Sequence, residues 1–215
     1  MPFDPQPTCD VTIDVSHHQG NIDWAAVKET GIECVMIKAT QGLAEDSLWR
    51  TNRDRARQQG LLVIPYTFLT TAVTPAEQAE FFIRTAGLAA GMPAALDWEG
   101  EGAPDAAFVE RIGLAVVEVI KRDPLGYWGI QPPDTPTALM KRWPRWIPRY
   151  GVNDGNPDLN HRPTEPWLFW QYTSNQEIDG INTPIDASLF AGSEAELKAW
   201  CETGALPASL AGAIV

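Results

Sequence analysis

Two carboxylate side chains stand one residue apart at the end of a short apolar run. The run Ala94-Ala95-Leu96 leads into Asp97-Trp98-Glu99. If this segment is a buried strand, residues two apart point to the same side, which places the Cα atoms of Asp97 and Glu99 about 6–7 Å apart. Two acids so placed can supply acid catalysis for the cleavage of a glycosidic bond. The alternative is a solvated strand end that leads into the loop 100–102, and the pair alone does not decide between them.

Further acids occur near both ends of the chain. Asp14 lies in a β-favouring run over residues 9–16 that breaks into the polar His17-His18-Gln19-Gly20. Near the other end, the aromatic run 167–172 predicts a strand, and Asp179 and Asp186 follow it. A turn or cap role would explain any one of these aspartates. Their shared position beside predicted strand ends favours a common site.

Strands and helices alternate through the first part of the chain. Thr74-Pro75-Ala76-Glu77 is a capping box with proline at the first helical position, which predicts a helix over 75–90. Alternation of this kind favours a parallel barrel or sheet over a sandwich. The other predicted strands are 33–39, 61–68 and 94–98, and the other predicted helices are 23–30, 46–59 and 104–122.

The pattern loosens beyond Asp123, where prolines interrupt short segments. A second capping box, Ser193-Glu194-Ala195-Glu196, starts a helix that we expect to run to about residue 202 and to end at Gly204. Between these points we expect a brief strand at 126–128, a short helix at 137–143, a strand at 145–150 and a loop over 151–166.

The size and composition fit one domain. A chain of 215 residues with 44% hydrophobic residues can bury a full core. We expect an N-terminal extension over 1–9, a catalytic body over 10–204 and a loosely packed tail over 205–215. No run reaches the ~18 apolar residues of a membrane span, and the first residues lack a secretory pattern. We therefore expect a monomer made in the cytoplasm, which another agent must release if it acts outside the cell.

Charge and cysteine content limit the possible partners. A net charge of −12 argues against nucleic acid, because phosphate binding needs clustered Lys and Arg. The basic and aromatic run 141–149 is the exception, and either solvated loop charges or contact with an anionic polymer would explain it. Cys9, Cys34 and Cys201 show no metal-ligand spacing and indicate buried thiols from a reducing compartment. We expect no metal and no cofactor, with His17 and His18 as hydrogen-bonding loop residues.

The chain has nine tryptophans. Aromatic faces stack on sugar rings, so tryptophans near predicted strand ends could line a glycan groove. Core packing is the alternative for each of them. The candidates are Trp98, Trp128, Trp146, Trp167 and Trp170.

Five motifs in order resemble the lysozymes of glycoside hydrolase family 25, the Chalaropsis-type muramidases that include many phage endolysins. They are 14–24 (DVSHHQGNIDW), 37–42 (IKATQG), 95–99 (ALDWE), 170–174 (WQYTS) and Ile185-Asp186. The resemblance runs from about residue 10 to residue 203. It implies an α/β fold, a single irregular (β/α) barrel similar to a TIM barrel, with some antiparallel strands near the C-terminus. It also implies hydrolysis, in peptidoglycan, of the β-1,4 bond between N-acetylmuramic acid and N-acetylglucosamine.

The resemblance also assigns residues. It implies that Glu99 is the general acid and that Asp97 orients the substrate's 2-acetamido group as nucleophile, with Asp14 and Asp186 as the remaining acids. A carboxylate cluster raises the pKa of its least solvated member, which agrees with a protonated acid near working pH. The substrate-binding residues that it suggests are Lys38, Tyr66, Trp98, Tyr127, Trp146, Tyr150 and Gln171.

Three positions depart from the family pattern. Thr67 stands where a histidine is usual on the third strand, Gln41 replaces a glutamate, and Pro148 replaces a small residue. None is one of the four acids, so activity is expected while subsite preference is open.

Two other classes of protein are the alternatives. A silent glycan-binding module would not need the acids, and a metal-dependent hydrolase would be accompanied by a nucleotide or phosphate-binding loop that the sequence lacks.

Overall fold

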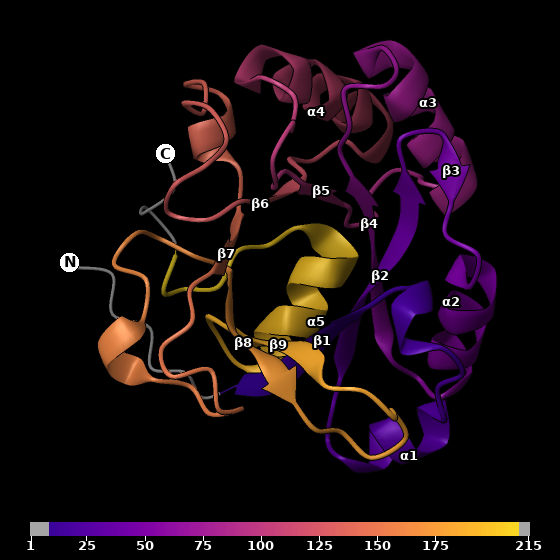
Figure 1. Cartoon of the computed structure of the whole chain (residues 1–215), viewed down its shortest axis with the longest axis vertical. Helices are drawn as coiled ribbons and strands as arrows, with labels where there is room; N and C mark the ends of the chain where they lie inside the picture. Colours follow the sequence, from indigo (N-terminus) through magenta and orange to yellow (C-terminus); the bar gives the residue numbers. More distant parts are fainter. Residues whose placement is uncertain (1–8, 211–215) are drawn as a thin grey trace.

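Strands from the whole length of the chain form one closed sheet. The computed structural model describes residues 9–210, and within them the sheet order is β1-β9-β8-β7-β6-β5-β4-β2-β3, closed by pairing of β1 with β2 (Figure 1). The strands are β1 (Cys9–Val15), β2 (Cys34–Gln41), β3 (Ala44–Glu45), β4 (Leu62–Phe68), β5 (Ala95–Asp97), β6 (Leu125–Tyr127), β7 (Arg145–Pro148), β8 (Phe169–Gln176) and β9 (Ile185–Phe190).

Strand direction changes near the C-terminus. The pairs from β1 through β2, β4, β5, β6 and β7 to β8 are parallel, whereas β9 runs antiparallel to both β8 and β1. The short β3 forms an antiparallel hairpin with β2 and lies outside the barrel. The predicted α/β barrel with antiparallel strands near the C-terminus is confirmed.

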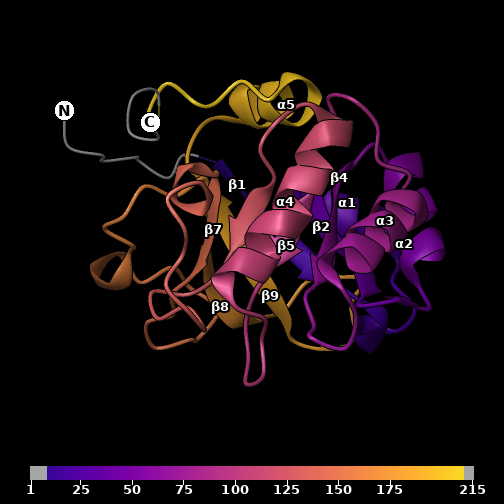
Figure 2. The same cartoon turned by 90° about the horizontal axis from the view of Figure 1, so that it is seen from above.

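Helices cover the outside of the barrel and one of its ends. α1 (Trp24–Glu29), α2 (Trp49–Gln58), α3 (Pro75–Ala86) and α4 (Ala106–Ile120) follow parallel strands, while α5 (Glu194–Thr203) lies across the end away from the carboxyl ends of those strands (Figure 2). Both predicted capping boxes form, at Thr74 for α3 and at Ser193 for α5. α3 ends at Ala86 rather than residue 90, because Gly87 takes a left-handed conformation with φ +67°.

The C-terminal half differs most from the predicted elements. The aromatic strand begins at Phe169 and continues to Gln176, and the segment after Pro184 forms β9, which the sequence patterns did not predict as a full strand. The short helix expected at 137–143 is the 3-10 turn η2 (Met140–Arg142), and the loop 151–166 contains η3 (Leu159–His161).

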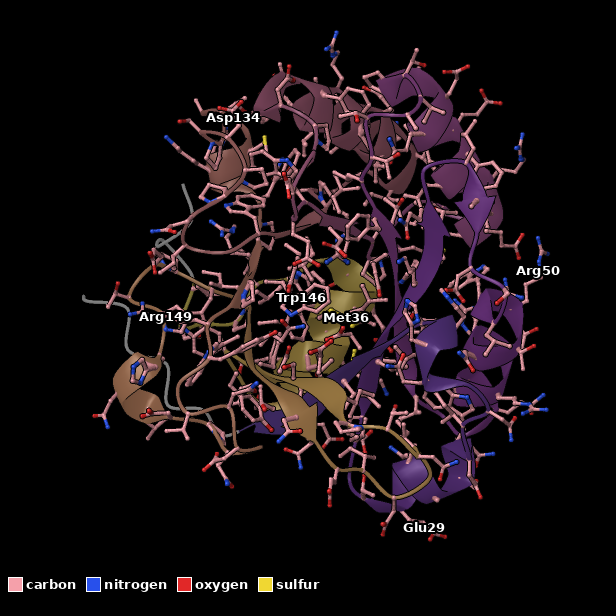
Figure 3. The ribbon with its side chains drawn as sticks, viewed as in Figure 1. Glu29, Met36, Arg50, Asp134, Trp146 and Arg149 are labelled. Carbon is pink, nitrogen blue, oxygen red and sulfur yellow. The ribbon has the colours of Figure 1, made fainter. Side chains whose placement is uncertain are left out.

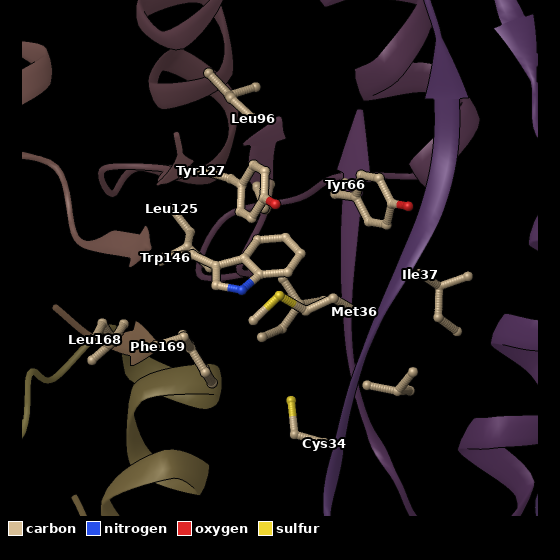
Figure 4. Close-up of a cluster of buried hydrophobic side chains, with 14 of the residues drawn as sticks. Cys34, Met36, Ile37, Tyr66, Leu96, Leu125, Tyr127, Trp146, Leu168 and Phe169 are labelled. Carbon is tan, nitrogen blue, oxygen red and sulfur yellow. The ribbon is translucent and has the colours of Figure 1, made fainter. Parts of the chain in front are cut away.

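Large side chains fill the barrel interior. Figure 3 shows Trp146 and Met36 at its centre, and Figure 4 shows Tyr66, Tyr127 and Trp146 gathered beside Met36 and Cys34. On the α5 side, Phe169 meets Trp200 at 5.7 Å between ring centroids. The barrel is therefore packed at the α5 end, and space for a ligand is left at the opposite end.

Of the two expected terminal segments, the structure describes Cys9 of 1–9 and residues 205–210 of 205–215. Within 205–210, Leu210 is buried and the Ser209 hydroxyl donates to the carbonyl of Ala191 at 2.6 Å. Among the helices of residues 9–210, none has the length and apolar character needed to cross a membrane. Cys34 and Cys201 are buried, as predicted.

Candidate active site

Four carboxyl groups gather at the open end of the barrel. Asp14 is at the end of β1, Asp97 ends β5, and Glu99 follows two residues later. Asp186 is near the start of β9, which runs antiparallel to β1 and so places Asp186 opposite Asp14 in the ladder. All four line a cleft of about 200 Å³, together with Val15, Ser16, His18, Gln19, Lys38, Tyr66, Phe68, Tyr127, Trp146 and Gln171.

The Asp97 and Glu99 side chains share one face of the chain, and Trp98 takes the other. Asp97 is buried, whereas Glu99 is exposed at the rim. Trp98 is fully buried outside the barrel wall, where its indole N–H donates to the Pro104 carbonyl at 2.7 Å and its ring meets Trp128. Trp98 therefore does not line the cleft, although the sequence analysis placed it among the substrate-binding residues.

Gln171 joins three cleft side chains through its amide. Its Nε2 donates to Asp14 Oδ2 at 2.9 Å, and its Oε1 accepts from the hydroxyls of Tyr127 at 2.9 Å and Tyr150 at 2.7 Å. These contacts leave no freedom in the orientation of the amide, because the oxygen faces two hydroxyl donors and the nitrogen faces a carboxylate. Gln171 lines the cleft, and its bond to Tyr150 holds that side chain beside it, while the role of both in substrate binding stays a prediction.

Asp14 and Asp186 form a carboxyl pair. Burial raises the pKa of Asp14 well above its ordinary value, and the charge of Asp186 raises it further. Burial also raises the pKa of Asp186, while a hydrogen bond from Asp14 opposes that rise. Two adjacent charges would repel each other, so the hydrogen bond between the two carboxyl groups favours the state in which one of them is protonated.

Asp97 and Glu99 form a second pair of neighbouring acids. Burial raises the pKa of Asp97 well above its ordinary value, and the charge of Glu99 adds to the shift. The pKa of Glu99 is raised by partial desolvation first and by the charge of Asp186 second. Asp97 Oδ1 is buried and has no hydrogen-bond partner among residues 9–210. A buried acceptor without a partner costs free energy, so this oxygen is poised for a donor that a ligand brings.

Lys38 is the cation of the cleft. Its charge lowers the pKa values of both Asp97 and Glu99 and so opposes part of the rise. The ammonium donates to Gln41 Oε1 at 2.8 Å and lies 4.9 Å from the centre of the Phe68 ring. Because Gln41 is neutral where the family pattern has glutamate, the charge of Lys38 stays available to the acids.

An aromatic wall faces the carboxylates. The Tyr127 and Trp146 rings are 4.4 Å apart between centroids, and Tyr66 meets Trp146 edge-on at 6.2 Å. The Trp146 indole N–H donates to Ser188 Oγ at 3.0 Å, which fixes the ring. Of the five candidate tryptophans, Trp146 alone lines the cleft. Trp98, Trp128, Trp167 and Trp170 are buried in the core, as the alternative interpretation held.

Two residues that line the cleft, Ser16 and Gln19, were not among the predicted site residues. Ser16 and Gln19 form a capping box around the 3-10 turn η1 (His17–Gln19), a signal present in the spacing of Ser16 and Gln19. This turn brings His18 into the cleft, while His17 Nδ1 pairs with Asp46 Oδ2 at 2.6 Å.

Thr67 points away from the cleft and accepts from the Thr40 hydroxyl at 2.7 Å. The departure at Thr67 thus lies behind the wall of the cleft.

The chain matches one protein family along most of its length. The model of the family described as "Glycosyl hydrolases family 25" matches residues 13–181. A protein of Escherichia coli strain K12 called YegX, which is described as uncharacterized, is 30% identical over 202 residues, covering 88% of this chain and 72% of its own length. The autolytic lysozyme of Clostridium acetobutylicum is 30% identical over 189 residues, covering 83% of this chain and 55% of that protein.

Solved structures share the fold. The lysozyme of Streptomyces coelicolor superposes with a TM-score of 0.73 at 24% identity, over 92% of this chain and 99% of that chain. The catalytic domain of endolysin ply40, from the Listeria monocytogenes bacteriophage P40, gives a TM-score of 0.69 at 20% identity, over 86% and 94% of the two chains.

Proposed function

Since this chain belongs to glycosyl hydrolase family 25 and is a muramidase-type glycoside hydrolase, we propose that it cleaves the β-1,4 bond between N-acetylmuramic acid and N-acetylglucosamine in the bacterial cell wall. The four-carboxylate cleft carries this proposal. Asp97 and Glu99 project from one strand end into the cavity, and the aromatic wall stands across from them. A binding module that did no chemistry would have no use for four carboxyl groups gathered in one cleft with pKa values raised chiefly by burial.

Glu99 acts as the general acid. It is the most exposed of the four acids, so its carboxyl group can reach the glycosidic oxygen of a bound glycan. Its raised pKa keeps a larger share of the side chain protonated toward neutral pH, as donation to the leaving oxygen requires. After the leaving sugar departs, the ionised Glu99 is placed to take a proton from the incoming water.

Asp97 receives and orients the acetamido group of the substrate. Its buried Oδ1 has no hydrogen-bond partner within residues 9–210, and an amide N–H of the sugar would provide one. Hydrogen bonding to a carboxylate favours its charged form, so substrate binding favours an ionised Asp97, and that negative charge in turn favours a protonated Glu99. The acetamido oxygen is then held as the nucleophile at the anomeric carbon.

Tyr66, Tyr127 and Trp146 would hold the sugar rings, and Lys38, Tyr150 and Gln171 would fix polar groups. Sugar faces are apolar and stack on aromatic rings, while their hydroxyls need donors and acceptors at the edge.

Trp98 has a structural role rather than a sugar-binding one. Its indole bond to Pro104 and its backbone bond to Tyr127 at 3.0 Å anchor the segment that carries Glu99.

The test is Glu99→Gln assayed on purified peptidoglycan. The amide is close in shape to the acid but cannot donate the required proton, so turnover should fall at least ~10²-fold. Mass spectrometry of the soluble products should show muramic acid at the reducing ends for wild type. Glu101→Gln, at an exposed acid in the following loop, is the matched control and should retain activity. Near-normal cleavage by folded Glu99→Gln, or reducing-end glucosamine in the products, would contradict the proposal.

A further inference from the structure

A second, larger cavity lies beside the catalytic cleft. It measures about 660 Å³, within the range of ~300–1,000 Å³ that is usual for small-ligand sites. Its walls are the β2–β3 hairpin with the two residues after it, the loop 70–73 after β4, and His17. Lys38 lines both spaces, so the cavity and the cleft adjoin at this side chain.

The lining of this cavity differs in kind from that of the cleft. Four aliphatic side chains, Leu43, Ala44, Ala72 and Val73, give it apolar wall, beside the polar Gln41, Ser47 and Thr70. No Phe, Tyr or Trp is among the described residues that line it, whereas the cleft has Phe68, Tyr66, Tyr127 and Trp146. Sugar rings are held by aromatic faces, so the cavity is poorly suited to a further sugar. It suits a chain that carries methyl groups.

The two acids that line the cavity already have partners. Glu45 is paired with Arg50 at 2.7 and 3.1 Å. Asp46 is buried and accepts from the backbone N–H of His17 at 3.0 Å and from that of Leu48 at 3.0 Å, in addition to the His17 ring. Both acids are therefore occupied. Lys38 is bonded to a neutral amide, and its charge is open to a ligand carboxylate.

The walls are held in place before any ligand binds. The backbone N–H of Thr70 donates to Gln78 Oε1 at 3.1 Å, and Gln78 Nε2 donates back to the Thr70 carbonyl at 3.0 Å. Gly42 has φ +57°, and its backbone approaches so near that a Cβ there would come within 2.9 Å of Thr70 Oγ1. The hairpin and the loop therefore touch across the base of the cavity, which lowers the cost of ordering on binding.

We propose that this cavity binds the peptide that N-acetylmuramic acid carries on its lactyl group. That peptide is short, contains alanine methyl groups and carries free carboxylates, and it begins on a sugar of the glycan in the cleft. The aliphatic walls take the methyl groups, and Lys38 at the border takes a carboxylate. The proposal rests on the proposed function, and it makes this chain selective for glycan strands that keep their peptides.

The experiment compares two substrates that differ only in the peptide. Soluble glycan strands are prepared with their peptides and, after treatment with an amidase, without them. For wild type, kcat/KM should be at least ~10-fold higher on the peptide-bearing strands. Leu43→Glu places a negative charge in the cavity and should remove most of this preference by lowering kcat/KM on peptide-bearing strands, with little change on bare strands. Leu43 is 46% exposed, so the variant should fold.

Leu114→Glu is the matched control, because Leu114 is also 46% exposed but lies on α4, outside the set of residues that line either cavity. It should keep the preference of wild type. Equal kcat/KM of wild type on the two substrates would overturn the peptide site while leaving the muramidase proposal intact. Equal losses by Leu43→Glu on both substrates would show a sugar subsite instead. If wild type cleaved neither substrate, the proposed function itself would fail, and the peptide site with it.

Discussion

Lys38 and Gln41 set the charge balance of the catalytic cleft. Four acids line the cleft, and Lys38 is the one Lys or Arg among its described lining residues. Because the hydrogen-bond partner of Lys38 is a neutral amide, this partner does not compensate the positive charge, which lowers the pKa values of Asp97 and Glu99. The departure at Gln41 from the family pattern thus has a definite electrostatic consequence for the catalytic acid.

Gln41→Glu should shift the pH dependence of catalysis. A carboxylate at hydrogen-bond distance from Lys38 would neutralise that cation, so the pKa of Glu99 should rise and the basic limb of the kcat profile should move to higher pH. A shift of up to about one pH unit is the expected scale for one nearby charge. Gln41→Met, which removes the hydrogen bond without adding charge, is the control. A basic limb that moves equally in both variants would assign the effect to the lost bond.

Asp97→Asn should separate rate from binding. The asparagine keeps the shape of the side chain but stabilises the reacting acetamido group poorly, so kcat should fall strongly while affinity for glycan stays close to that of wild type. The lost negative charge should also ease ionisation of Glu99 and move the basic limb of kcat to lower pH. The measurements are pH–rate profiles and glycan binding by calorimetry. An unmoved basic limb would mean that the two acids are not coupled during turnover.

At the scale of elements, three tryptophan side chains pack in a row and contact α4. Trp98, Trp128 and Trp143 form a row of edge-to-face contacts, at 5.9 and 6.5 Å between centroids. Gly113 of α4 lies against the last ring, where an added Cβ would come within 2.3 Å of the Trp143 indole. The glycine is thus required by close approach of a helix to an indole.

Gly113→Ala should therefore destabilise the chain although alanine is the better helix former. Helix propensity alone would stabilise by ~1 kcal/mol, but forced displacement of a packed ring typically costs ~1–3 kcal/mol. We expect a net loss, measured by urea unfolding. The double variant Gly113→Ala, Trp143→Leu makes room for the methyl group and serves as the control. Comparison of the double variant with the two single variants should give a coupling energy, which an effect of helix propensity alone would not produce. Stabilisation by Gly113→Ala alone would contradict this packing.

The sequence predicted the elements that carry strong local signals. The capping boxes at Thr74 and Ser193 gave two helix starts correctly, and alternation around Asp97 gave the acid pair. The same alternation places Trp98 on the opposite face, a consequence that the sequence analysis missed when it assigned Trp98 to the groove. β9 was missed because its pattern is set by pairing on both sides with β8 and β1, which no local signal carries.

Most of the site depends on closure of the barrel. Gln171 bonds Asp14 across 157 positions of sequence, and only the placement of β8 and β9 beside β1 brings them together. The second cavity likewise arises where the β2–β3 hairpin meets the loop after β4. The residue types indicated acid catalysis. The hydrogen-bond partners of the acids and the cavity beside the cleft depend on long-range topology.

At the scale of the whole molecule, the barrel separates stability from chemistry. α5 and the large aromatic side chains fill one end, whereas the open end concentrates buried acids that repel one another. Asp14, Asp97 and Asp186 all have pKa values raised above the ordinary value of 3.8, with burial as the first cause. Ionisation of these buried carboxyl groups at neutral pH destabilises the folded state, so the catalytic cluster lowers the free energy of unfolding.

This gives stability a pH dependence of definite sign. Between the ordinary aspartate pKa and the raised values of the folded state, the native protein binds more protons than the unfolded chain. The free energy of unfolding therefore falls as pH rises through that window. Asp186→Asn removes one of these charges and leaves an amide that can still bond Asp14. It should raise the Tm at pH 7 relative to wild type, with a smaller gain near pH 4, while lowering turnover.

Asp179→Asn provides the control, because it makes the same charge change at an exposed position in the loop between β8 and β9. If the gain came merely from reducing the net charge of −12, both variants would gain equally. We expect Asp186→Asn to gain more, since its carboxylate is partly buried and faces Asp14. The check is thermal unfolding of the three proteins from pH 4 to pH 8. Wild-type stability that rises steadily across this range, or equal gains by the two variants, would refute the view that the acid cluster strains the fold.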